Sequence, residues 1–230
     1  MKINFKTYLN ERLKQVDFHG NLTFPLYVQV TYDRKTIYFK SYYFELLSKP
    51  RYLLSVPGVG TKAPAMDEII EQENKVISFI IEKHKHDFSL DLFKRAYAYY
   101  SRDICDIMEG GYVQYLYTFF WDEGNPAIGD VLLYGCKNVV AYDVVRDFKR
   151  VIIQKTYEKL VENSLYFAPP YLPVYGFMSE TKQWPMLILT VMEFEQQEIM
   201  EAFARYVHAH YPYRSAIDIL EEAAKCIDVM

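Results

Sequence analysis

Cysteine is scarce in this chain, and its spacing excludes two classes of protein. Cys105, Cys136 and Cys226 are the three cysteines among 230 residues, and no Cys-x-x-Cys pair occurs. A disulfide framework or a zinc knuckle requires more closely grouped cysteines. We therefore expect reduced thiols in a cytoplasmic protein that needs no structural metal.

Long apolar runs are missing as well. The longest strongly apolar stretch, Met186 to Met192, is far shorter than the roughly 20 residues that cross a bilayer. Residues Met1 to Asn10 alternate polar and apolar side chains and lack the continuous apolar region of a signal peptide. We expect no membrane partner and no secretion.

Motifs that carry catalysis or bind metals are also lacking. No Gly-x-Ser-x-Gly occurs, and the paired histidines at 84/86 and 208/210 are two residues apart, so on a helix they point in different directions. The glutamates between 193 and 201 have no Glu-x-x-His partner, so a solvated acidic face is expected. The sequence thus predicts no catalytic residue, no metal ligand and no cofactor. An enzyme assembled from distant residues stays an open alternative.

Aromatic residues, in contrast, are abundant. The chain has 22 tyrosines and 15 phenylalanines, and 51% of its residues are hydrophobic. These side chains bury large areas, while tyrosine keeps a polar tip for water or a partner. Such a surplus indicates well-packed faces or an interface, and it supports a second alternative, a protein-interaction or scaffolding module.

The charges are divided unevenly along the chain. Residues 1–62 contain ten basic and four acidic side chains, a formal charge of +6. Because the whole chain carries -4, residues 63–230 carry -10. A basic module joined to an acidic body is typical of a polyanion contact, although two solvated surfaces or mutual attraction of the halves would give the same count.

The basic module has the pattern of a small β-sheet. Leu26, Val28 and Val30 alternate with polar or aromatic residues, Tyr32 to Lys35 has the composition of a turn, and Thr36 to Tyr43 alternates again. Ile3 to Leu9 shows the same period and would add a third strand, since a lone hairpin is marginal in water. The stretch from Lys49 to Pro64, rich in Pro and Gly, is expected to link this module to the C-terminal part of the chain.

Beyond residue 63 the apolar period becomes helical. We therefore expect an α+β fold, in which a small N-terminal antiparallel sheet of about three strands (domain 1–62) precedes a mainly helical body of five to seven helices (domain 63–230). Three prolines make Ala168 to Pro173 non-helical in this prediction. The expected helices are Asp67 to His84, a helix capped by Ser89 and ending before Gly110-Gly111, Tyr112 to Trp121, Asn138 to Asn163, Pro185 to about His208, and Ser215 to Cys226.

One part of the basic module resembles a known family. Residues 24–41 read FPLYVQVTYDRKTIYFKS, which is similar to the pattern P-L-Y-L-R-V-T-x-x-R-K-x-x-Y-x-S/T. That pattern belongs to the arm-type DNA-binding domain that opens many mobile-element tyrosine recombinases (integrase-like). The resemblance covers about 90 residues, because Met1 to Leu13 and Met66 to Phe93 also look like the segments that flank this domain. It implies a three-stranded sheet with a helix packed behind it.

The sequence also departs from that family. Ser41 runs into Tyr42-Tyr43-Phe44 instead of a Gly-containing turn and a Trp-bearing segment. The recombinase active site requires His-x-x-Arg, which occurs nowhere in this chain. The resemblance therefore implies a non-catalytic relative, without the catalytic domain.

These observations predict a non-enzymatic DNA-binding or accessory protein of a mobile-element context. DNA affinity comes largely from lysine and arginine that release counterions, so the basic residues of the hairpin are the candidates, with double-stranded DNA as the partner. A protein partner is the alternative. The predicted DNA-binding residues are Arg34, Lys35, Lys40, Tyr32 and Tyr38.

Overall fold

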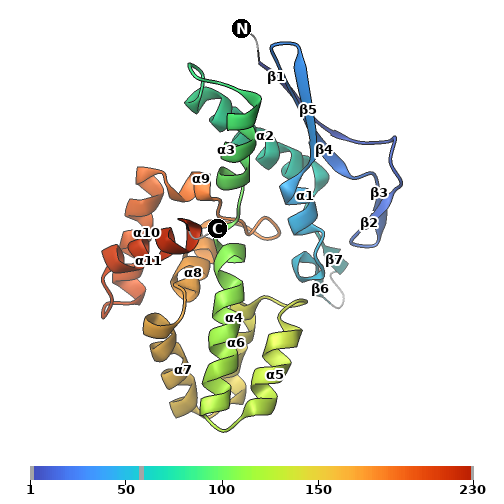
Figure 1. Ribbon diagram of the computed structural model, residues 1–230. Coiled ribbons are helices and arrows are strands. Elements are labelled where there is room, and N and C mark those ends of the chain that lie inside the picture. The colour runs from blue at the N-terminus through green and yellow to red at the C-terminus, as the bar shows by residue number, and fades with distance from the viewer. Residues whose placement is uncertain (1–2, 57–59, 229–230) are drawn as a thin grey trace. The chain divides into compact units, whose positions relative to one another are not determined.

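The computed structural model describes residues 3–56 and 60–228. The chain divides into two compact units, which we describe separately. The first comprises Met1–Arg102 with Trp184–Met186, and the second comprises Asp103–Gln183 with Leu187–Met230. An α+β fold with an N-terminal antiparallel sheet is therefore confirmed (Figure 1). The expected boundary after residue 62 lies inside the first unit, because the next two helices pack with the sheet.

The first unit is built on a three-stranded antiparallel sheet in the order β1-β4-β5. Its strands are β1 (Asn4–Leu9), β4 (Leu26–Tyr32) and β5 (Lys35–Lys40). In the central strand, Leu26, Val28 and Val30 are fully buried, and the residues between them are half-buried. This alternation is the one that the sequence predicts, and β1 is the predicted third strand.

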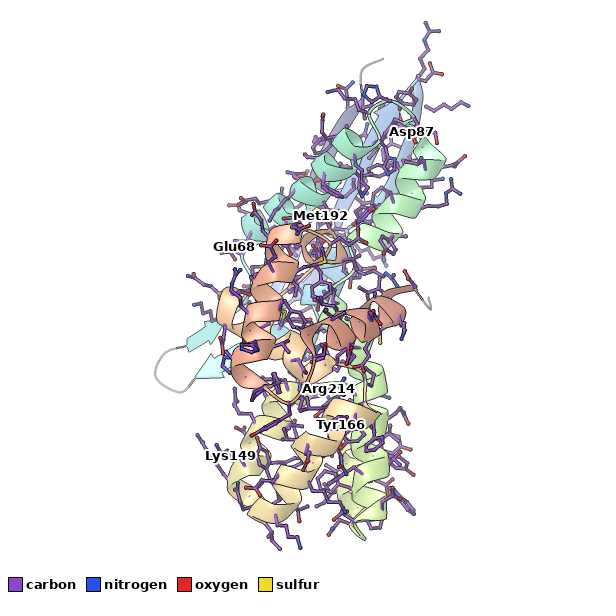
Figure 2. The ribbon with its side chains drawn as sticks, turned by 90° about the vertical axis from the view of Figure 1, so that its left-hand side faces the viewer. Glu68, Asp87, Lys149, Tyr166, Met192 and Arg214 are labelled. Atoms are coloured by element: carbon purple, nitrogen blue, oxygen red, sulfur yellow. The ribbon has the colours of Figure 1, made fainter. Side chains whose placement is uncertain are left out.

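Helices cover the apolar side of this sheet. Helix α2 (Met66–Lys83) and helix α3 (Leu90–Tyr100) form a pair there (Figure 1), and Figure 2 labels Glu68 near the start of α2 and Asp87 just beyond its end. The predicted Ser89 cap is confirmed, because its Oγ accepts a hydrogen bond of 3.2 Å from the backbone N–H of Leu92. Strand β5 ends earlier than expected, since Ser41 caps helix α1 (Tyr42–Leu47).

Short hairpins complete the first unit, and the sequence patterns do not predict them. Strands β2 (Val16–Phe18) and β3 (Asn21–Thr23) pair around a turn at His19 and Gly20, both of which have positive φ. After the short 3-10 helix η1 (Pro50–Tyr52), strands β6 (Leu54–Val56) and β7 (Gly60–Lys62) pair within the predicted linker, of which residues 57–59 lie outside the described part.

The second unit is helical throughout its regular elements. Helices α4 and α8 form its centre: nine residues of α4 are buried, and α8 is buried continuously from Tyr171 to Met178. None of the helices in the described ranges is long and apolar enough to cross a membrane. The helices are α4 (Ile104–Asp122), α5 (Pro126–Gly135), α6 (Ala141–Val151), α7 (Gln154–Phe167), α8 (Tyr171–Thr181), α9 (Val191–Phe194), α10 (Gln197–His210) and α11 (Ala216–Asp228).

Buried carboxylates tie this unit together. Asp103 caps α4 by accepting from the backbone N–H groups of Cys105 and Asp106, and it also accepts from Leu189 N–H at 3.1 Å. Glu109 accepts from the backbone N–H of Ala141 at 2.9 Å and from the Tyr171 hydroxyl at 3.0 Å. These acceptors satisfy backbone donors that would otherwise be buried without a partner.

The predicted helix boundary at Gly110-Gly111 is wrong. Both glycines lie inside α4, where a Cβ on Gly111 would stand 2.9 Å from Cγ of Pro169. Glycine at that position permits the close approach of the Pro169 segment. A glycine pair in a sequence signals either a helix end or a close packing contact, and tertiary packing decides between them.

Three further helix predictions need correction. The segment from Asn138 to Asn163 forms two helices, because the β-branched run at Ile152 and Ile153 is extended and lets α7 fold back on α6. The segment Ala168 to Pro173 was expected to be non-helical, but α8 begins at Tyr171. Pro173 lies in the first turn of this helix, where the backbone N–H groups have no partner within the helix, so a proline there costs no helical hydrogen bond. Pro185 starts no helix, and α9 and α10 follow it separately. The described residues after residue 62 form ten α-helices, α2 to α11, so the five to seven expected for the helical body were too few.

The glycines of the second unit provide a matched test of its packing. An alanine Cβ at Gly129 in α5 would lie 2.9 Å from the backbone oxygen of Tyr117, whereas at Gly110 it would meet no described atom within 4 Å. We predict that Gly129→Ala lowers the free energy of unfolding by about 1–3 kcal/mol, because backbone cannot yield easily. The control Gly110→Ala should raise it by up to about 1 kcal/mol. Urea unfolding of both variants checks this, and equal effects would contradict it.

Candidate functional site

The face of the sheet opposite the helices is the candidate site. Pairing places nine side chains on this face in three rows across the strands, and none of them is buried. We call this set the outer face. Its rows are Asn4, Thr31 and Thr36; Lys6, Gln29 and Tyr38; and Tyr8, Tyr27 and Lys40.

Contacts on the inner face confirm this assignment. The Thr7 hydroxyl donates a hydrogen bond of 2.7 Å to Oδ1 of Asn74 in α2. The Phe39 ring lies 4.6 Å from the Tyr97 ring of α3, measured between centroids. Because successive side chains of a strand point to opposite faces, the neighbours of Thr7 and Phe39 must point away from the helices. Tyr38, which is 60% exposed, does so.

The structure distributes the five predicted DNA-binding residues over three places. Tyr38 and Lys40 lie on the outer face, and Arg34 lies at the exposed hairpin tip. Tyr32 and Lys35 oppose each other on the helix side of the sheet. There the Tyr32 ring packs edge-on against Phe88 at 4.9 Å between centroids.

Lys35 borders a groove at the tip of the hairpin. The groove of about 590 Å³ lies between β5 and the start of α3, and its charged lining residues are Asp33, Lys35, Asp91 and Lys94. Two acidic and two basic groups leave it without net charge. The outer face is therefore the better site for a polyanion.

The turn between β4 and β5 holds an arginine in an unusual conformation. Asp33 and Arg34 have φ angles of 47° and 62°, in the left-handed region that glycine favours. Two-residue hairpin turns of this kind usually carry Asn-Gly or Asp-Gly. An arginine there costs conformational energy, and a residue held in such a state is a reason to look for function.

Charges on and beside the outer face are mainly positive. Lys6 lies with its Nζ 5.2 Å from the centre of the Tyr8 ring, and Lys40 pairs with Glu45 at 3.3 Å. Both partners of that pair are more than half exposed, so the ion pair contributes little and can be exchanged for another anion. Within the described residues, Arg34 and Lys35 form no ion pair.

Sequence reasoning missed Lys6, Gln29 and Tyr27 as members of the site. Lys6 belongs to a strand that is distant from the hairpin in sequence, and Gln29 lies among the alternating residues that define β4. The signal that could have found them is the alternation of side chains between the two faces of a strand. Once the strand pairing is known, this alternation assigns the polar residues of a half-buried strand to the solvent face.

A buried carboxylate fixes the sheet to its helices. Glu73 of α2 accepts hydrogen bonds from the hydroxyls of Ser41, at the end of β5, and of Tyr97 in α3. Tyr97 also accepts a hydrogen bond of 3.2 Å from the backbone N–H of Tyr42. Burial raises the pKa of Glu73 to about 7, although both hydroxyl hydrogen bonds act in the opposite direction. One carboxylate thus joins β5, α1, α2 and α3.

Three of the histidines and glutamates considered in the sequence analysis have structural partners. Glu193 caps α9 together with Thr190 and pairs with Lys182 at 2.7 Å. His84 pairs with Asp87, and His210 pairs with Glu180. In the ranges that the structure describes, no three histidine, cysteine or acidic side chains come together as a metal site.

Comparison of the chain with protein-family models, with curated proteins and with solved structures finds no match. The outer face and its charges therefore carry the functional argument.

The raised pKa of Glu73 predicts a change of stability with pH. The folded state holds this proton more tightly than the unfolded state, whose glutamate has a pKa near 4.5. The contribution of Glu73 to stability is then complete below pH 4.5 and is lost as the pH rises through about 7. Between pH 4.5 and 8 this loss should be on the order of 3 kcal/mol.

Glu73→Gln cannot ionise and should lack that decline. Urea unfolding of both proteins between pH 4.5 and 8 should give curves that diverge, with the wild type losing more stability. Burial also raises the pKa of Asp103 to about 7. Asp103 is present in both proteins, so its contribution cancels from the difference between their unfolding free energies. Parallel curves would show that Glu73 does not titrate in this range.

Proposed function

We propose that this chain is a non-enzymatic DNA-binding or accessory protein that contacts duplex DNA through the outer face and Arg34. The observation that carries the proposal is a solvent-facing sheet surface with Lys6, Lys40 and Gln29 on it, beside a hairpin tip that bears an arginine. The similarity of residues 24–41 to arm-type DNA-binding domains supports a mobile-element context.

The dimensions of the outer face suit a DNA groove. Neighbouring strands lie about 4.8 Å apart, so the two outer strands of this sheet are separated by about 10 Å. The major groove is about 12 Å wide, and β-sheets are known to bind in it. The tip of the β4–β5 hairpin would then project along or beyond the groove and bring Arg34 to the phosphates.

The side chains of the outer face divide into two roles in this proposal. Lys6, Lys40 and Arg34 are flexible cations suited to phosphates, which fix the position of a protein but carry no sequence information. Gln29 lies at the middle of the central strand, between Lys6 and Tyr38. Its amide has the donor and acceptor that pair with an adenine edge. Tyr38 and Tyr27 offer hydroxyls and ring surface on either side.

Salt dependence tests the phosphate contacts. Each lysine that meets a phosphate contributes about one unit to the slope of log K against log salt concentration. We predict that Lys6→Gln and Lys40→Gln in the full chain each weaken binding to duplex DNA and each reduce the slope by about one unit. Lys149→Gln, an exposed lysine of the second unit labelled in Figure 2, is the matched control and should leave the slope unchanged.

Negligible binding of the full chain to varied duplexes at low salt would end the DNA proposal. The protein-interaction alternative would then stand first. If all three variants bind DNA with the same slope as the wild type, Lys6 and Lys40 do not contact phosphates. The outer face would then not be the contact surface.

Arg34→Gly separates folding from binding. Glycine adopts a φ of 62° without strain, so this change should raise the free energy of unfolding by roughly 1 kcal/mol. It also removes a cation from the hairpin tip and should weaken DNA binding severalfold. Thermal unfolding and a DNA titration of the same preparation measure both effects. A variant that is more stable and binds DNA as tightly as the wild type would exclude Arg34 from the interface.

A further inference from the structure

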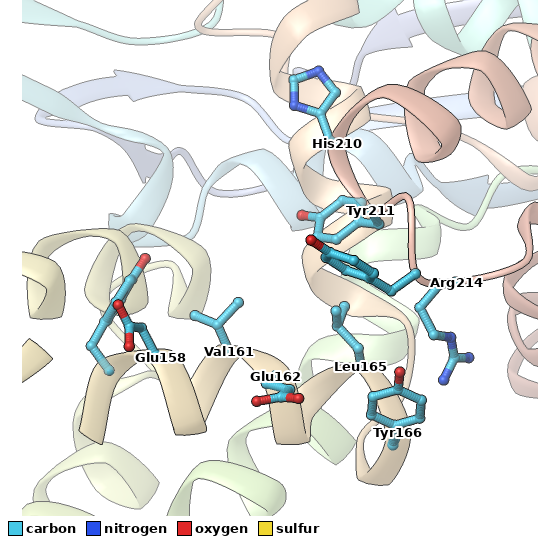
Figure 3. A pocket seen from close by; sticks show the side chains of 10 residues that line it. Glu158, Val161, Glu162, Leu165, Tyr166, His210, Tyr211 and Arg214 are labelled. Carbon is cyan, nitrogen blue, oxygen red and sulfur yellow. The ribbon is translucent and has the colours of Figure 1, made fainter. Parts of the chain in front are cut away.

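A second candidate site lies in the helical unit, apart from the outer face. A pocket of about 460 Å³ opens between one side of α7 and the segment that joins α10 to α11 (Figure 3). Its lining combines aromatic rings with carboxylates, and the members that matter are Tyr157, Tyr166, Tyr211, Tyr213, Glu158 and Glu162.

Helix α7 supplies one wall through its periodicity. Tyr157, Val161 and Leu165 follow one another at spacings of four, and Glu158, Glu162 and Tyr166 form the adjacent row. Residues four apart lie on the same side of a helix, so both rows face the pocket together. The aromatic and aliphatic groups thus sit directly beside the two carboxylates, as Figure 3 shows for Val161, Glu162 and Leu165.

The opposite wall is held by a hydrogen-bonded turn. The backbone N–H of Arg214 donates to the carbonyl oxygen of Tyr211 at 2.9 Å, and that of Tyr211 donates to the carbonyl of Val207 at 2.7 Å. The side chain of Arg214 is 8% exposed and donates to Glu222 of α11 at 2.8 Å. These bonds fix Tyr211 and Tyr213 opposite α7.

The charges around the pocket leave it negative. Glu222 neutralises Arg214, and Nε2 of His210 lies 3.7 Å from a carboxylate oxygen of Glu180, which offsets the charge of the imidazole whenever it is protonated. Glu158 accepts a hydrogen bond from Gln154 but pairs with no cation among the described residues, and Glu162 forms no ion pair there either. Two carboxylates therefore remain without a positive partner at the rim of an aromatic pocket.

One ring of the pocket already binds a cation within the protein. The guanidinium carbon of Arg214 lies 4.8 Å from the centre of the Tyr166 ring, and Figure 2 shows these two residues next to each other. The negative face of an aromatic ring attracts positive charge, and the attraction grows when the cation is removed from water. Within the described residues, the rings of Tyr157, Tyr211 and Tyr213 bind no cation.

We propose that this pocket binds an organic cation, an alkylated ammonium group, with its methyl groups against Tyr157, Tyr211 and Tyr213 and its charge beside Glu158 and Glu162. Alkylated ammonium ions suit such a lining because they combine apolar surface with positive charge and are recognised by aromatic cages in other proteins. The site is independent of DNA binding, so either proposal can fail without the other.

Choline and its uncharged isostere 3,3-dimethylbutan-1-ol test the site in the full chain. The two probes have nearly the same shape and differ in charge. Titration followed by NMR should show choline binding at least about fivefold more tightly than the alcohol, because only choline gains from cation–π attraction. A peptide with trimethyllysine is a third probe: tighter binding than choline would indicate a modified side chain as the ligand, and equal binding would indicate a free small molecule.

Variants assign the binding to the pocket. Tyr213 is 89% exposed, so Tyr213→Leu should leave folding intact while it lowers choline affinity at least about threefold. Tyr213→Phe keeps the ring and should bind like the wild type. Glu162→Gln should lower the affinity for choline and leave the affinity for the alcohol unchanged. The matched control is Tyr134→Leu, an exposed tyrosine of α5 that does not line the pocket.

Equal affinities of choline and the alcohol would overturn the proposal, because the pocket would then be a simple apolar hollow. Absence of saturable choline binding would overturn it as well. So would a Tyr213→Leu variant that binds choline like the wild type.

Discussion

Burial of one side of β4 is the constraint on which the rest of the first unit depends. Leu26, Val28 and Val30 have no exposed surface, and each large apolar side chain removed from water contributes about 1.5–3 kcal/mol. A strand has a side-chain period of two, so a register shift of one residue would move all three into water and Gln29 into the core. The composition of the outer face is therefore set by the same energy that holds the sheet on α2.

Sequence patterns correctly predicted those features of the fold that depend on residues close together in the chain. The alternation in β4 and β5, the turn at residue 33 and the Ser89 cap each depend on neighbours within a few residues, and each is present. Gly111 and Pro173 were misread because their roles depend on distant contacts: Gly111 makes room for Pro169, and Pro173 happens to fall in a first helical turn. The short hairpins carry too few residues for a period to be seen.

The candidate site was only partly predictable for the same reason. Charge and hairpin pattern pointed to five residues of one hairpin, between Tyr32 and Lys40, but a sheet face selects alternate residues from several strands. Two of the five predicted residues, Tyr32 and Lys35, consequently lie on the helix side, and Lys6 from β1 enters the outer face through pairing with Gln29. The pocket of the second unit needs α7 and the segment after α10 together, which no single stretch reveals.

The acidic second unit affects how DNA binding would depend on salt. Residues 1–102 contain sixteen basic and eleven acidic side chains, a charge of +5, and the rest of the chain carries -9. Repulsion between that charge and DNA reaches about 30 Å at 0.01 M salt but only about 8 Å at 0.15 M. Added salt thus weakens phosphate contacts and relieves repulsion at the same time. In the proposed complex, a second unit within these distances of the DNA would lower the slope, so the change in slope on replacing one lysine reports the contact more directly than the slope itself.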